Sequence, residues 1–96
     1  MPQFRVTLLQ SKPVAAVTHD GFLGKLATFH IQRLSDRRTY SYEGHGGGKQ
    51  FELRCQLLLE AGGVLVDVPD PSTTIPDTAW KETVVNRAME EAERLQ

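Results

Sequence analysis

The chain has 96 residues, of which 40% are hydrophobic and 24% are charged, and its formal net charge is −1. These are ordinary values for a folded globular domain, and they argue against the collagen-like, coiled-coil and intrinsically disordered classes. No apolar run approaches the roughly 18 residues needed to cross a bilayer, and the first residues lack a signal-peptide pattern, so we expect a soluble cytoplasmic protein with no membrane partner.

The length predicts a single domain over residues 1–96 with one hydrophobic core. The charge is uneven along it, because residues 1–54 carry a net charge of +4 and residues 55–96 a net charge of −5. A folded surface needs charges of both signs for solubility, and the two halves can partly neutralise each other. We favour this interpretation over a dedicated anion-binding face.

The N-terminal residues predict a strand with one buried face. Phe4, Val6 and Leu8 alternate with polar neighbours, and a period of two is typical of such a strand. Lys12 and Pro13 interrupt the pattern, since proline cannot donate a hydrogen bond to a sheet. We therefore expect the first strand to end before them.

A second β-rich run covers residues 14–19 and ends at Asp20-Gly21, a dipeptide suited to a tight hairpin turn. The segment 22–34 that follows fits a helix or a strand. We predict a strand over about 26–34, because its central residues favour β-structure. A further strand is expected at 39–43.

The segment 49–61 decides between two architectures. Five apolar residues alternate with polar ones, which predicts a strand: Phe51, Leu53, Cys55, Leu57 and Leu59. A helix fits this pattern worse, because its apolar residues would spread around most of the circumference. The helix nevertheless stays an alternative, since the segment is rich in good helix formers and Gly62 could end it.

The glycine loop Gly44–Gly48 takes its meaning from that choice. Before a helix it would be a phosphate-binding loop, whereas before a strand it only turns a hairpin. It is not a Walker A motif, because Gly44 lies one position too close to Gly48-Lys49 and Gln50 replaces the required hydroxyl residue. We expect the hairpin.

The last third predicts a strand at 64–68, a proline-rich loop at 69–76 and an amphipathic helix at 77–95. Trp80 is the largest apolar side chain on that helix, and we expect it to anchor the helix to the sheet. With residues 3–68 rich in strands, the predicted fold is α+β: an antiparallel meander of about five to six strands packed against one amphipathic C-terminal helix.

One stretch interleaves cations with aromatic and imidazole rings, and it supplies the candidate ligand-binding residues: Arg37, Arg38, Tyr40, Tyr42, His45 and Lys49. Single-stranded nucleic acid or an anionic aromatic ligand could stack on such a surface. The alternative is that the tyrosine rings pack against the core. Nucleic acid is not favoured, because the net charge is −1 and no known nucleic-acid-binding signature is present.

For catalysis the best pair is Glu43 with His45, two positions apart on one strand face, with His19 and Asp20 from another turn as candidate partners. Nothing identifies a nucleophile or an orienting third group, so no catalytic residue is predicted. The three histidines lack zinc-type spacing, and the single Cys55 cannot form an intrachain disulfide. We predict no metal and no cofactor.

The leading hypothesis is therefore a non-catalytic binding or interaction module for a protein partner or a small ligand. We expect it to form a homodimer, with three apolar residues at the margins of their patterns exposed at the dimer surface: Leu58, Val85 and Met89. The alternatives are a single-stranded nucleic-acid or anionic-ligand binder using the stretch from Arg37 to Lys49, and a small enzyme using Glu43 and His45.

Overall fold

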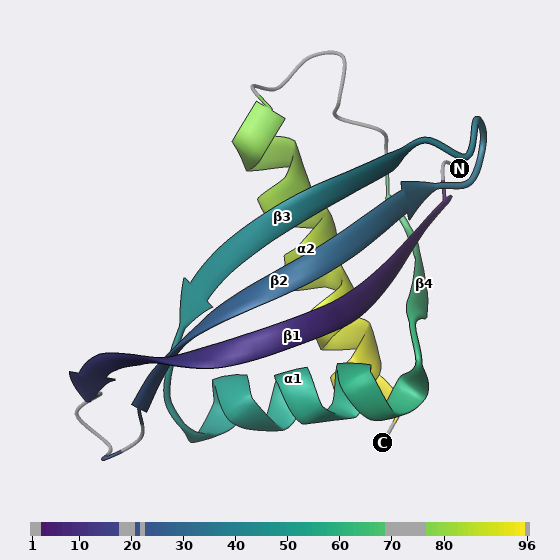
Figure 1. Ribbon diagram of the computed structural model, residues 1–96. Coiled ribbons are helices and arrows are strands. Elements are labelled where there is room, and N and C mark those ends of the chain that lie inside the picture. The colour runs from purple at the N-terminus through teal and green to yellow at the C-terminus, as the bar shows by residue number, and fades with distance from the viewer. Residues whose placement is uncertain (1–2, 18–20, 22, 69–76, 96) are drawn as a thin grey trace.

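The computed structural model describes residues 3–17, 21, 23–68 and 77–95 (Figure 1). It is an α+β fold with four strands and two helices. Their order and bounds are β1 (Gln3–Val17), β2 (Leu23–Arg33), β3 (Thr39–Gly46), α1 (Lys49–Ala61), β4 (Val64–Asp67) and α2 (Asp77–Arg94).

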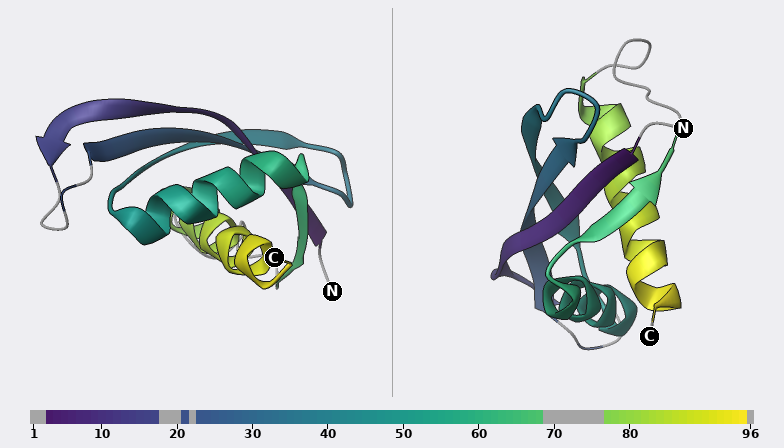
Figure 2. Two further views of the ribbon diagram at one scale, coloured as in Figure 1. Left: turned by 90° about the horizontal axis from the view of Figure 1, so that it is seen from below. Right: turned by 90° about the vertical axis from the view of Figure 1, so that its right-hand side faces the viewer.

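The four strands form one sheet in the order β3-β2-β1-β4, and every neighbouring pair is antiparallel. β4 is short and pairs only with Gln3–Val6 of β1. Figure 2 shows the sheet arched over both helices, which lie on the same side of it. The described part of the chain therefore has two layers, with the core between them.

The core is built from alternate strand residues and from the inner stripe of α2. Phe4, Val6 and Leu8 of β1 are buried, as the period of two predicts. Trp80 of α2 is only 2% exposed, and its ring packs edge-on against Tyr40 with 4.8 Å between centroids and against Phe4 at 6.0 Å. The prediction that Trp80 anchors the C-terminal helix is confirmed.

The strand predicted within residues 49–61 is wrong, because this segment is the helix α1. It buries Cys55 and Leu58 but leaves Leu53 and Leu59 exposed, so the alternation in the sequence did not reflect a buried face. The good helix formers decide instead, together with Gly62, whose φ of +70° ends the helix while its N–H donates to the carbonyl of Leu59.

The count of five to six strands is also too high, because β1 is one strand that continues through Lys12 and Pro13. The register of β1 against β2 shifts between Leu8 and Gln10. This irregularity lets the strand continue although the alternation of apolar and polar residues is interrupted. Pro13 is tolerated because no described strand lies on the outer side of β1 there, and a strand with one neighbour does not need every N–H. Asp20 of the expected hairpin turn lies outside the described residues.

The other elements follow the sequence prediction closely. β2, β3, β4 and α2 each overlap the expected strand or helix. The exposure expected for Leu58, Val85 and Met89 is wrong, since they are 0%, 3% and 4% exposed. With two helices on the sheet instead of one, these apolar residues are covered within the chain.

Candidate functional site

The structure distributes the predicted ligand-binding residues over three places. Tyr40 and Tyr42 point from β3 toward the helices and are half-buried, while Glu43 and His45 lie exposed on the opposite face. The two arginines lie in the turn before β3, and Lys49 is the first residue of α1. The stretch therefore does not form one continuous surface.

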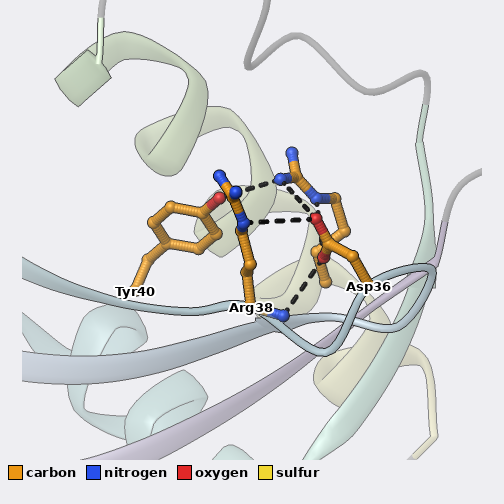
Figure 3. A network of polar contacts seen from close by, with 4 residues as sticks. Asp36, Arg38 and Tyr40 are labelled. Carbon is orange, nitrogen blue, oxygen red and sulfur yellow. Dashed lines mark hydrogen bonds and ion pairs between the residues drawn. The ribbon is translucent and has the colours of Figure 1, made fainter.

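The arginines belong to a polar network that closes the β2–β3 turn (Figure 3). Asp36 accepts hydrogen bonds from Nε of Arg33 at 3.2 Å, from Nη2 of Arg33 at 2.9 Å and from the backbone N–H of Arg38 at 3.1 Å. Nη2 of Arg33 also donates to the hydroxyl of Tyr40 at 2.9 Å. These bonds hold the pKa of Asp36 below its usual value, those from Arg33 first and that from Arg38 second.

Sequence reasoning missed Arg33, whose side chain is only 11% exposed. Its guanidinium carbon lies 5.6 Å from the centre of the Tyr40 ring, and Nζ of Lys81 lies at the same distance. Tyr42 packs against Phe29, and burial raises its pKa, with a smaller contribution from Glu82. The tyrosine rings thus serve packing in this structure, and their role in binding stays a prediction.

The glycine loop Gly44–Gly48 does precede a helix, but packing and backbone conformation explain three of its glycines without a bound ligand. A Cβ added to Gly46 would lie 2.4 Å from the ring of Phe51, and one added to Gly44 would lie 3.0 Å from Cε2 of Tyr42. Gly48 precedes α1 with a φ of +94°, a conformation that favours glycine. Glu52 already places a carboxylate in the first turn of the helix. These glycines therefore need no bound phosphate to account for them.

Glu43 and His45 share one face of β3, as their spacing predicts. His19 and Asp20, their expected partners, lie outside the described residues. Among residues 3–17, 21, 23–68 and 77–95, no three His, Cys, Asp or Glu side chains come together in a group that could hold a metal ion.

A groove that sequence reasoning missed lies between α1 and the β1–β2 hairpin. Its volume is about 520 Å³, within the range of roughly 300–1,000 Å³ typical of ligand sites. Most of its surface is apolar. It is lined from β1 and β2 by Leu8, Ser11 and Lys25, and from α1 by Lys49, Glu52, Leu53, Cys55, Gln56 and Leu59.

The groove has polar groups at one end and apolar groups along its length. Nζ of Lys25 lies 3.5 Å from Oε1 of Glu52, and Lys49 lies one turn before Glu52 on the same helix. Cys55 is 6% exposed, and its burial, with a smaller contribution from Glu52, raises the pKa of its thiol to about 11. The thiol is therefore protonated near neutral pH and is a poor nucleophile.

The sequence does contain a signal for this groove. Glu52, Gln56 and Leu59 recur at helical spacing, and they come to one side only if residues 49–61 form a helix. The strand interpretation placed Glu52 and Gln56 on one side and Leu59 on the other. The signal was therefore missed because a strand period of two was assumed where the helical period applies.

No described helix combines the length and the apolar character needed to cross a membrane. No protein-family model matches the sequence, and no curated protein and no solved structure matches it either.

Proposed function

We propose that the chain is a non-catalytic binding module and that the groove between α1 and the β1–β2 hairpin holds its ligand. The observation that carries this proposal is the make-up of the groove, which joins an apolar surface to two lysines at one end. The ligand class that fits is an extended apolar group with an anionic group at one end.

Exposed leucines on α1 support the apolar part of this proposal. Leu53 is 41% exposed and Leu59 is 51% exposed, and both line the groove. Burial of apolar surface contributes about 25 cal/mol for each Å² removed from water. A ligand that covers these two side chains therefore gains affinity from surface that folding left in contact with solvent.

The charges support the anionic part. Among the residues that line the groove, Lys25 and Lys49 are cationic and Glu52 is the one carboxylate, so the lining itself has a net positive charge. The side chains of Lys25 and Glu52 are 26% and 36% exposed, and ion pairs with such access to water contribute about 0–1 kcal/mol. An incoming anion can therefore compete with Glu52 for Lys25 at little cost.

The groove offers binding groups and no evident catalytic set. The hydroxyl of Ser11 and the thiol of Cys55 line the groove, and the lining holds no histidine to activate either of them. The raised pKa of Cys55 further disfavours a thiolate. These features favour a binding module over an enzyme.

A titration with octanoate, monitored by backbone amide shifts, tests the proposal. We expect shifts confined to residues that line the groove, and weaker binding of octylamine, whose ammonium group the lysines repel. Replacing Lys25 and Lys49 together by Gln should remove the preference for octanoate, whereas Arg87→Gln on α2 should leave it unchanged. Shifts scattered over the surface, or equal binding of the two probes, would refute the proposal.

Self-association is a separate part of the proposed function. Leu58, Val85 and Met89 are buried, so the surface proposed for a second copy becomes the outer edge of β3, which pairs only with β2 in the described sheet. One backbone carbonyl of β3, that of Ser41, accepts a hydrogen bond from Nζ of Lys81 at 3.4 Å. Sedimentation equilibrium at micromolar concentration decides the point, and a mass of 10.7 kDa would refute the homodimer without affecting the groove.

A further inference from the structure

We infer that the natural occupant of the groove is an extended peptide from a partner protein, added to the outer edge of β1 as a further strand and resting on α1. This inference rests on the proposed function of the groove and names its ligand. Strand addition is a general mode of peptide recognition, in which the main chain supplies affinity and alternate side chains supply specificity.

The first observation is the incomplete pairing of β1. β4 covers its outer side only at Gln3–Val6, and from Thr7 onward no described residue pairs with that side. Such an edge presents backbone N–H and C=O groups that can pair with another strand. Leu8 and Ser11, which belong to this uncovered part, also line the groove. The groove and the open edge are therefore one surface.

The second observation is the position of α1, which lies alongside this edge on the helix side of the sheet. Figure 1 shows α1 running along the outer side of β1, and Figure 2 shows it on the helix side of the sheet. The helix has 13 residues, about 20 Å at 1.5 Å per residue. Six residues of an extended chain span about 20 Å as well. An extended hexapeptide therefore has about the length of α1, and every second side chain of it would be directed toward Leu53, Gln56 and Leu59.

The charges and the direction of β4 orient the peptide. An added strand that continues the line of β4 runs antiparallel to β1, so its N-terminal end lies toward the β1–β2 turn. The lysines lie at that end, because Lys25 pairs with Pro13 and Lys49 begins α1. The expected ligand therefore has an acidic residue first and apolar residues at alternate positions after it.

The edge also carries features that limit what can pair with it. The register irregularity between Leu8 and Gln10 bends the strand, and Lys12 and Pro13 follow within a few residues. Bulges, lysine and proline are the means by which natural edge strands avoid open-ended aggregation. Here they confine pairing to a short segment, which suits a peptide better than a long strand.

Fluorescence anisotropy of a labelled peptide, Asp-Leu-Thr-Leu-Thr-Leu, tests the inference. Two further peptides carry N-methyl groups on the leucines or on the threonines. Since successive N–H groups of a strand point to opposite sides, we expect one methylated peptide to bind about tenfold or more weakly and the other to bind as the parent does. Leu53→Asp should abolish binding, and Leu65→Asp, an exposed leucine outside the groove lining, should not.

The outcomes separate this inference from the proposed function. If octanoate binds in the groove but the peptide does not, or if both methylated peptides bind like the parent, strand addition is refuted while the groove remains a ligand site. If neither octanoate nor the peptide binds, both proposals fail. Peptide binding that Leu53→Asp leaves intact would place the peptide on another edge and overturn the inference.

Discussion

The two helices pack on the same face of the sheet, yet they differ in what they do with their apolar residues. α2 buries its whole inner stripe: Trp80, Val84, Val85, Ala88, Met89 and Ala92. α1 buries only Cys55 and Leu58 and leaves two leucines exposed beside a groove. Exposed apolar side chains add nothing to the core, so α2 contributes more buried apolar surface to stability than α1, and one side of α1 stays accessible for the proposed ligand.

The largest expected effect contrasts one residue from each helix. Trp80→Ala should lower the free energy of unfolding by about 3–5 kcal/mol, because a large buried ring is lost from contacts with Phe4 and Tyr40. Leu53→Ala should change it by less than about 0.5 kcal/mol, since this side chain is substantially exposed. Urea denaturation followed by circular dichroism measures both. If the two variants lose similar amounts of unfolding free energy, the proposed difference between α2 and α1 is wrong.

A second prediction concerns how α1 is attached to the sheet. A Cβ at position 46 would lie 2.4 Å from the ring of Phe51, so Gly46→Ala should cost about 1–3 kcal/mol through overpacking. Phe51→Leu in the same chain should recover part of that loss, because the smaller side chain leaves room for the methyl group. A double-mutant cycle in urea gives the coupling energy. A cycle with no coupling would mean that the two residues do not contact each other.

The ion pair between the two helices should contribute less to the free energy of unfolding than the packing of Gly46 against Phe51. Nε of Arg54 on α1 donates to Oε2 of Glu93 on α2 at 2.9 Å, and both side chains are about one-third exposed. Arg54→Gln should therefore cost at most about 1 kcal/mol, and less in high salt. Arg87→Gln, which removes two ion pairs within α2 alone, is the matched control. A loss above about 2 kcal/mol would show that the position of α1 depends on this single pair.

The smallest expected effect lies in the β2–β3 turn. The hydrogen bonds from Arg33 hold the pKa of Asp36 below its ordinary 3.8. This carboxylate therefore contributes stability above pH 3.8, and the contribution is lost as the pH falls through the lower pKa of the folded state. Asp36→Asn should reduce the urea midpoint at about pH 6 more than at about pH 3. Equal reductions at both pH values would contradict a role for the charge.

The sequence predicted most of the fold because most elements carry a local pattern. Alternation in Phe4, Val6 and Leu8 and the helical spacing from Trp80 onward each point to one structure. Residues 49–61 show the alternation of a strand, but they are also rich in good helix formers and end at Gly62, so two local signals disagree about which structure forms. The alternation alone could not decide between them.

The groove was missed because the helical spacing of its α1 residues was read as a strand and because its two walls are distant in sequence. It exists because α1 lies beside the part of β1 that β4 leaves uncovered, and neither fact is local. The residues chosen from the sequence were those whose chemistry stands out in one stretch, such as Arg38 and Tyr40, which form part of a turn network. Lys25 of β2 comes together with Lys49 and the leucines of α1 only through the tertiary structure.

The short pairing between β4 and the start of β1 also has a consequence for folding. Val6 pairs with Val64, whereas Pro13 pairs with Lys25, so the first contact closes a much longer loop than the second. The entropy of closing the longer loop costs about 1 kcal/mol more. We therefore expect the β1–β2–β3 hairpins to form first and β4 to dock late. Until β4 docks, the outer edge of β1 is open along its whole length, and a newly made chain can be captured there by the strand of a neighbour.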